Sequence, residues 1–226
     1  MLKKILIICI ASFMMPVAAN SQTQNLDKFE DQIESFRRFD ARNQLPENPI
    51  LFVGSSSIVF WETAKSFPDL PITNRGFGGA SLPEVIHYYD DVIKNHNPSM
   101  MIVYCDIDVE NGKSPDFSVN AFKELINKVE ADFDEIPILL MSMKPTLIDD
   151  DLGADVRKNK MITNQKLIEY TRSKSNLHYV DITSPMLDQD GKLREDIFID
   201  DGMHLNPLGY TLWDPIMTAA IEKVRK

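Results

Sequence analysis

Cysteine is nearly absent from this sequence of 226 residues, which contains only Cys9 and Cys105. Cys9 falls in an N-terminal segment that we expect to be removed, and Cys105 ends the apolar run "MMIVYC". The remaining chain therefore cannot form an internal disulfide, and core packing must hold it together. A buried strand cysteine is the favoured interpretation of Cys105, ahead of a catalytic thiol.

The start of the chain lacks an apolar stretch long enough for an ordinary membrane span. The stretch from Ile5 to Val17 is short, follows two lysines and precedes small residues. This pattern predicts a secretory signal peptide over residues 1–21 and an exported protein, periplasmic or extracellular, without a membrane span after cleavage. A retained N-terminal anchor is the alternative.

Basic side chains are in the minority. Once the signal peptide and its two lysines are removed, 22 basic and 34 acidic side chains remain, a net charge of −12. Such a balance makes nucleic acid an improbable partner. Residues 22–226 suffice for a single domain with a full core, and they contain no internal repeat, glycine-serine linker or low-complexity segment.

Short apolar runs alternate with polar segments of helical length. The runs share Ile- and Val-rich composition and span residues 49–54, 70–76, 100–105, 136–143 and 176–182. Five such runs separated by helices indicate βαβ units and a mostly parallel sheet, that is, an α/β fold.

The segments between the runs have the periodicity of amphipathic helices. Residues 81–96 and 119–133 place apolar side chains on one stripe and are predicted to be crossover helices. A leading helix is expected over residues 25–44, and a closing helix over 206–226 should be interrupted near Pro215. The leading helix has four apolar side chains that should point inward: Phe29, Ile33, Phe36 and Phe39.

The loop after the fourth run, "MSMKPTLIDDD", is expected to border a pocket, with Lys144 as a candidate pocket residue. A lysine at a strand end is more often simply solvated. The acidic stretch 147–155 is interpreted as a solvated loop, because its ligand order does not match that of an EF-hand calcium loop.

Three consecutive serines follow the first run, in "ILFVGSSSIVFW". Ligands of such sheets bind beyond the carboxyl ends of the strands. Gly54 ends the predicted strand, so Ser55, Ser56 and Ser57 occupy the turn and the first helical positions, where backbone N–H groups are unpaired. A serine there either caps the helix or acts as a nucleophile whose oxyanion those N–H groups would hold.

Two further stretches favour the nucleophile. In "IDDGMHLNPLGY", Asp201 and His204 lie three residues apart, so the carboxylate can orient the imidazole and leave its other nitrogen free to accept a serine proton. A metal site is disfavoured there because no second His or Cys lies at ligand spacing. In "NRGFGGASL", the glycines 76, 78 and 79 allow close backbone approach, although a tight turn explains them as well.

Together these stretches resemble the SGNH hydrolases, also called GDSL-type esterases and lipases. The resemblance covers most of the chain and is closest to bacterial members described as lysophospholipase-like or platelet-activating-factor-acetylhydrolase-like. It implies that Ser56 is the nucleophile, His204 the general base, Asp201 its orienter, and Ser56 and Gly79 the backbone oxyanion donors. It also implies a flavodoxin-like three-layer α/β/α sandwich with a five-stranded parallel sheet in the order 2-1-3-4-5.

One block departs from the family pattern. After the third strand the family usually has an asparagine whose amide is another oxyanion donor, but this chain has "YCDIDVENGKS". Depending on the alignment, Ile107 or Asp108 takes that position, and neither side chain can donate to an oxyanion when the aspartate is ionised. Asn111 is the nearest amide, and Gly78, Ile107, Asp108 and Asn111 are candidate pocket residues.

The resemblance implies an exported serine ester hydrolase that needs no cofactor or metal and acts on a small-molecule or glycan ester. Short acyl groups, such as acetyl groups on carbohydrates, are the expected substrates, because no long apolar lid segment separates the strands. The alternative is a weakened or inactive SGNH-fold protein that only binds an ester or glycan. A phosphoesterase is disfavoured because neither a phosphate loop nor a metal cluster is evident.

Overall fold

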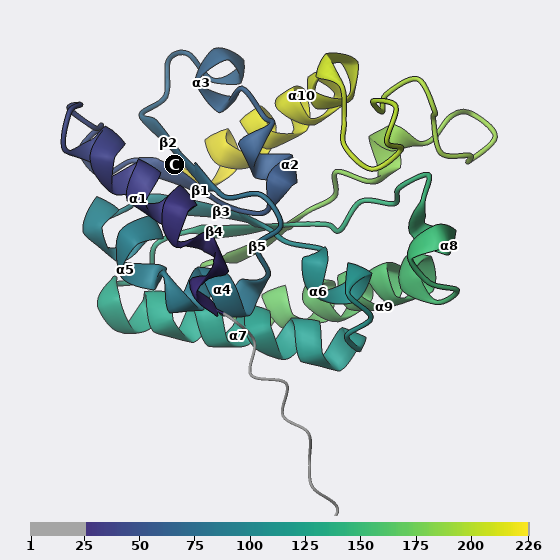
Figure 1. Ribbon diagram of the computed structural model, residues 1–226, viewed down its shortest axis with the longest axis horizontal. Helices are drawn as coiled ribbons and strands as arrows, with labels where there is room; N and C mark the ends of the chain where they lie inside the picture. The colour runs from purple at the N-terminus through teal and green to yellow at the C-terminus, as the bar shows by residue number, and fades with distance from the viewer. Residues whose placement is uncertain (1–25, 226) are drawn as a thin grey trace, which may run out of the picture.

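The structure, a computed structural model, describes residues 26–225, and the predicted signal peptide lies outside that range. Its centre is a sheet of five parallel strands in the order β2-β1-β3-β4-β5, which confirms the expected topology (Figure 1). The strands are β1 (Ile50–Gly54), β2 (Ile72–Gly76), β3 (Met100–Tyr104), β4 (Ile138–Met141) and β5 (Leu177–Val180).

Helices cover both faces of the sheet and complete three layers (Figure 1). The α-helices are α1 (Glu30–Asp40), α2 (Ser56–Val59), α3 (Thr63–Ser66), α4 (Leu82–His87), α5 (Tyr89–Val92), α6 (Ile107–Glu110), α7 (Pro115–Asp132), α8 (Asp149–Leu152), α9 (Val156–Thr171) and α10 (Pro207–Val224). Three 3₁₀ turns span Leu26–Phe29, Lys94–His96 and Ser184–Met186. No helix in the described range is long and apolar enough to cross a membrane.

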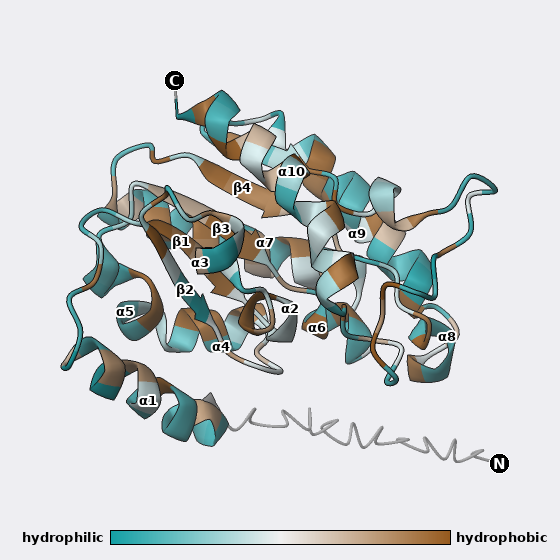
Figure 2. Ribbon diagram, turned by 90° about the horizontal axis from the view of Figure 1, so that it is seen from above, coloured by the Kyte–Doolittle hydropathy of each residue, from teal (hydrophilic) through white to brown (hydrophobic). Residues whose placement is uncertain are grey.

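Each strand contributes to two separate hydrophobic cores because its side chains alternate between the faces. In β1, Leu51 and Val53 join the core beneath α4, α5 and α7, whereas Ile50 and Phe52 join the core beneath α2 and α10. Figure 2 shows the mostly hydrophobic strands β1, β3 and β4 between helices that carry both hydrophilic and hydrophobic residues. A sheet buried on both faces explains why the sequence has continuous apolar runs.

The carboxyl ends of the first three strands are level with one another. Gly54 is in register with Gly76 on one side and with Tyr104 on the other, so the loops after β1, β2 and β3 start side by side. A β-carbon on Gly54 would lie 1.8 Å from the carbonyl oxygen of Tyr104, and one on Gly76 would lie 2.8 Å from the side chain of Ile58. These close approaches need glycine, and they seat α2 directly on the strand ends.

Three helix predictions need correction. Phe39 is 52% exposed, because α1 buries only Ile33 fully and Phe36 in part. Residues 81–96 form α4, α5 and a 3₁₀ turn instead of one helix, since the backbone leaves the helical region at Tyr88 and again at Ile93. Pro215 does not interrupt α10. The carbonyl that its missing N–H leaves free belongs to Thr211, which lies on the exposed face of that helix.

Candidate active site

The first element of the site is the short helix α2, which starts at Ser56. Ser55 precedes it in an extended conformation and donates its N–H to the carbonyl of Tyr104 at 3.4 Å. Ser55 and Ser57 are buried, whereas Ser56 is partly exposed. Of the three serines, Ser56 is therefore the one that a solvent-borne molecule can reach.

The second element is the loop before α10, and it meets the first. His204 Nε2 lies 2.8 Å from Ser56 Oγ, and His204 Nδ1 lies 2.6 Å from Asp201 Oδ2. The structure thus brings together three residues that are up to 148 positions apart in sequence. Because the carboxylate accepts a hydrogen bond from the Nδ1–H group, the ring keeps its proton on Nδ1 and the lone pair at Nε2 faces the serine hydroxyl.

Asp201 is itself held in place by the backbone. Its Oδ1 accepts the N–H groups of Met203 at 2.8 Å and His204 at 2.9 Å. Partial burial raises the pKa of Asp201, but the hydrogen bonds from the His204 ring and from these two N–H groups outweigh it, so the pKa is lowered. The carboxylate that orients the histidine therefore stays ionised at neutral pH.

The glycine loop after β2 contributes backbone rather than side chains. Gly79 has a φ of +79°, a conformation that favours glycine, and a β-carbon there would meet no heavy atom within 4 Å. Gly78 donates its N–H to Gln32 Oε1 at 3.2 Å, so that group is occupied. Within residues 26–225, the N–H groups of Ser56 and Gly79 have no hydrogen-bond acceptor.

The loop after β3 presents an aliphatic side chain at the start of α6. Ile107 is half-buried against the core, whereas Asp108 is 3% exposed and accepts the N–H of Leu82 at 3.3 Å. Burial raises the pKa of Asp108 to about 6, although the Leu82 bond opposes it. Asn111 caps the end of α6, and its side chain is exposed. Asp108 is thus engaged with the start of α4.

Lys144 does not border open space. It is 1% exposed, and its ammonium lies 3.3 Å from both Asp106 Oδ2 and the Tyr104 hydroxyl. It belongs to a buried ionic network beyond the ends of β3 and β4, whose members are Asp106, Glu110, Lys144, Asp149 and Lys160. Neither the solvated lysine nor the fully solvated acidic stretch expected from the sequence is found, because Asp149 is also buried.

The network is fully paired. Lys160 Nζ lies 2.7 Å from Glu110 Oε1 and 2.8 Å from Asp149 Oδ1. Burial alone would lower the pKa of Lys160, but Asp106, Glu110 and Asp149 outweigh it, so the pKa is raised. Sequence reasoning missed this network because several of its pairs join residues far apart in the chain, as in Lys144–Asp106 at 38 positions and Lys160–Glu110 at 50.

Two aromatic residues near the triad, as we call Ser56, His204 and Asp201, were also missed. The Phe60 ring stands edge-on to the His204 ring, with centroids 4.9 Å apart, and is 52% exposed. Tyr210 on α10 donates its hydroxyl to the carbonyl of Ser57 at 2.9 Å, which ties the helix after His204 to the helix that begins with Ser56. An aromatic residue gives no sequence signal for which neighbour it will contact.

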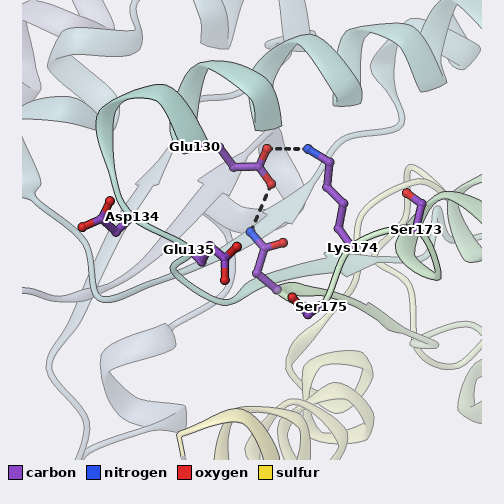
Figure 3. A pocket seen from close by; sticks show the side chains of 7 residues that line it. Glu130, Asp134, Glu135, Ser173, Lys174 and Ser175 are labelled. Carbon is purple, nitrogen blue, oxygen red and sulfur yellow. Dashed lines mark hydrogen bonds and ion pairs between the residues drawn. The ribbon is translucent and has the colours of Figure 1, made fainter.

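A hollow of about 500 Å³ lies away from these residues, between the end of α7 and the turn before β5 (Figure 3). Glu130 pairs there with Lys174 and accepts a hydrogen bond from Asn176 at 3.1 Å. This hollow is at the amino end of β5, whereas ligands of such sheets bind at the carboxyl ends. Within the described residues no group of three or more His, Cys, Asp or Glu side chains could hold a metal ion.

Comparisons with known proteins find solved structures that are similar to this one and a family that the sequence matches. The chain is similar to the structure of a GDSL-like lipase from Bacteroides thetaiotaomicron, with 18% identity over 84% of this chain and 97% of that one and a TM-score of 0.72. It is also similar to a Streptococcus pneumonia protein provisionally described as a platelet activating factor, with 19% identity over 86% and 93% and a TM-score of 0.76.

A third similar structure is a carbohydrate esterase family 3 protein from Talaromyces cellulolyticus, with 14% identity over 78% of this chain and 97% of that one and a TM-score of 0.59. A search of curated protein sequences finds no match. Residues 59–212 match the GDSL-like Lipase/Acylhydrolase family, a range that starts three residues after Ser56 and includes Asp201 and His204. The chain therefore belongs to the GDSL-like lipase/acylhydrolase family.

Proposed function

We propose that this protein is a serine ester hydrolase in which Ser56 is the nucleophile, His204 the general base and Asp201 its orienting carboxylate. The observation that carries the proposal is the pair of hydrogen bonds of 2.8 Å and 2.6 Å that links these side chains. The partial exposure of Ser56 at the carboxyl end of the sheet gives an ester access to it.

In the first half-reaction, Ser56 Oγ attacks the ester carbonyl carbon as His204 Nε2 takes the hydroxyl proton. Asp201 stabilises the imidazolium that forms. When the tetrahedral intermediate collapses, the bond between carbonyl carbon and alcohol oxygen breaks, and His204 returns its proton to that oxygen. The products are an alcohol and an acyl group on Ser56.

Two backbone N–H groups are available for the oxyanion. Those of Ser56 and Gly79 are free of protein acceptors in the described range, and both lie at loops that start from level strand ends. Ile107 adds no donor. Loss of one oxyanion donor costs about 100- to 1000-fold in turnover in another hydrolase, so we expect this enzyme to be slow.

In the second half-reaction, His204 removes a proton from a water molecule, whose oxygen attacks the acyl carbon. Collapse of the second tetrahedral intermediate breaks the bond to Ser56 Oγ, and His204 gives that oxygen its proton. The acid leaves and the starting state is restored. No step requires a metal or an organic cofactor.

Short acyl esters, including acetyl groups on carbohydrates, are the proposed substrates, and the protein is proposed to act after export. Support for the substrate comes from similar structures that are carbohydrate esterases, namely the Talaromyces protein, a family 3 esterase from Clostridium thermocellum and an acetyl-xylooligosaccharide esterase from Geobacillus. Support for export comes from the lysines and apolar stretch at the start of the sequence.

A second candidate is a protein that binds an ester or glycan without hydrolysing it. Ile107 favours this candidate, because it stands where the family resemblance implies a donor amide. The short contacts among Ser56, His204 and Asp201 oppose it, since a binding site gains nothing from a serine hydroxyl aligned on an imidazole.

Hydrolysis of p-nitrophenyl esters from acetate to octanoate separates the two candidates. We expect the highest rate with acetate and a loss of at least about 10⁴-fold in kcat for Ser56→Ala. Ser173→Ala, at the other end of the molecule, is the matched control and should keep the wild-type rate. Full activity in Ser56→Ala would refute the hydrolase mechanism.

A further inference from the structure

A second hollow, of about 360 Å³, borders the triad between α2, α3 and α10. Figure 1 shows these three helices together on one side of the sheet. Phe60 lines this hollow and also packs against His204, and Leu205, which follows His204, lines it as well. Phe60 and Leu205 therefore link the hollow to His204, which does not itself line it.

The Phe60 ring is unusually accessible for its size. It is 52% exposed, whereas the adjacent Trp61 is 2% exposed. The backbone of Phe60 is fixed, because its N–H donates to the carbonyl of Ser56 at 2.9 Å. A half-exposed aromatic ring in the lining of a hollow offers a flat apolar face to a ligand.

The rest of the hollow combines hydrogen-bond donors and acceptors. The indole N–H of Trp61 donates to Asp214 Oδ1 at 2.9 Å and contacts Ser66 Oγ at 3.2 Å, which fixes both side chains. Glu62 and Lys65 form an exposed ion pair of 3.1 Å at the rim. The residues that line the same space carry one cation, two carboxylates and three hydroxyl groups, those of Ser66, Thr211 and Tyr210.

These groups fit a sugar ring better than an acyl chain or an ion. Sugar hydroxyls donate to carboxylates and accept from ammonium and hydroxyl groups, and the C–H face of the ring packs on an aromatic side chain. An acyl chain would cover polar groups of the hollow without hydrogen-bonding to any of them. A simple anion would meet the carboxylates of Glu62 and Asp214, and a simple cation would meet the ammonium group of Lys65.

The chemistry of the proposed reaction also points to the alcohol part of the ester. His204 must lie within hydrogen-bond reach of the leaving oxygen in order to protonate it. The alcohol part therefore lies beside the imidazole, and Phe60, which packs against that imidazole, is also part of the lining of the hollow. We propose that this hollow binds the sugar ring of an acetylated carbohydrate whose acetyl group is presented to Ser56; this inference rests on the proposed function.

The test compares an acetylated xylooligosaccharide with ethyl acetate, which has no sugar. The quantity is the ratio of kcat/KM for the two esters. We expect Phe60→Ala to lower this ratio about tenfold or more and Asp214→Asn to lower it less, because the amide oxygen of that variant still accepts from Trp61 and only one acceptor site is lost. Phe39→Ala removes an equally exposed ring far from the triad and should leave the ratio unchanged.

A binding measurement decides the matter without turnover. Titration of an unacetylated xylooligosaccharide into the Ser56→Ala protein should give saturable binding, and Phe60→Ala in that background should weaken it about tenfold or more. A wild-type ratio in active Phe60→Ala would overturn the sugar site but not the hydrolase. Absence of binding would overturn the sugar site as well, whereas hydrolysis that survives Ser56→Ala would overturn the hydrolase mechanism.

Discussion

Two polar constellations lie beyond the carboxyl end of the same sheet, and they are built in opposite ways. The triad is partly exposed, with side-chain exposures of 42% for Asp201 and 19% for His204, and its serine hydroxyl and two nearby N–H groups have capacity left for a ligand. The ionic network around Lys160 is dry, with exposures of 0 to 6%, and its ammonium groups are paired with carboxylates.

This difference in exposure and pairing distinguishes residues that take part in the proposed reaction from residues that stabilise the fold. A group that must bind a reacting atom needs access and a free lone pair or proton, as the proposed nucleophile and oxyanion donors have. A buried charge without a partner is costly, so a network that only shapes the fold is saturated. Breaking the network should therefore destabilise the folded protein, whereas changing the triad should leave its stability almost unchanged.

The largest change in stability is expected from Lys160→Met. The substitution leaves Glu110 and Asp149 buried without their shared cation, and loss of one partner in a buried pair costs about 3–5 kcal/mol. Urea unfolding followed by circular dichroism measures the change. Lys158→Met, on the exposed face of the same helix, is the matched control and should unfold as the wild type does.

A smaller effect, on rate and not on stability, is expected from Ile107→Asn. An amide at the start of α6 supplies the donor that the family resemblance implies, so we expect kcat for p-nitrophenyl acetate to rise by about 10- to 100-fold. Ile107→Leu conserves volume without a donor and should not raise kcat. An unchanged rate in Ile107→Asn, with the fold intact, would show that this position does not face the oxyanion.

The smallest effect tests a carboxyl that belongs to neither constellation. An unfolded aspartate ionises near roughly pH 3.9, whereas burial raises the pKa of Asp108 to about 6. The folded chain therefore holds more protons between these values. The contribution to stability is complete below about pH 4 and is lost as the pH rises through about 6.

Asp108→Asn should remove this dependence while keeping the acceptor for the Leu82 N–H. We expect the variant to be about 2 kcal/mol more stable than the wild type at about pH 8 and equal to it at about pH 4. Chemical unfolding at the two pH values measures the difference. Asp116→Asn, at a side chain that is 77% exposed, is the control, and an equal gain at both pH values would contradict the linkage.

Much of this molecule follows from its sequence because the signals are local. The five apolar runs became strands in the expected order, and Leu125 and Val129 became the inward face of α7. The motif residues Ser56, Asp201 and His204 lie together because each follows or precedes an element whose end the sequence marks. Short, regular patterns of this kind can be located from the local sequence alone.

The parts that the sequence did not predict depend on partners far along the chain. The burial of Lys160 depends in part on Glu110, which is 50 residues away in the sequence. The exposure of Phe60 beside His204 arises only when α2 and α10 meet. Pro215 was expected to interrupt α10, but whether a helix tolerates a proline depends on which face of the helix is solvated.

The most direct test of the central claim is covalent labelling with a fluorophosphonate, followed by intact-mass analysis and peptide mapping. Attack by an activated serine expels fluoride and leaves one phosphonyl group per chain. The account predicts a single adduct on Ser56, slower labelling in His204→Ala and none in Ser56→Ala. An adduct on Ser55 or Ser57 instead, or no adduct on the folded wild-type protein, would contradict it.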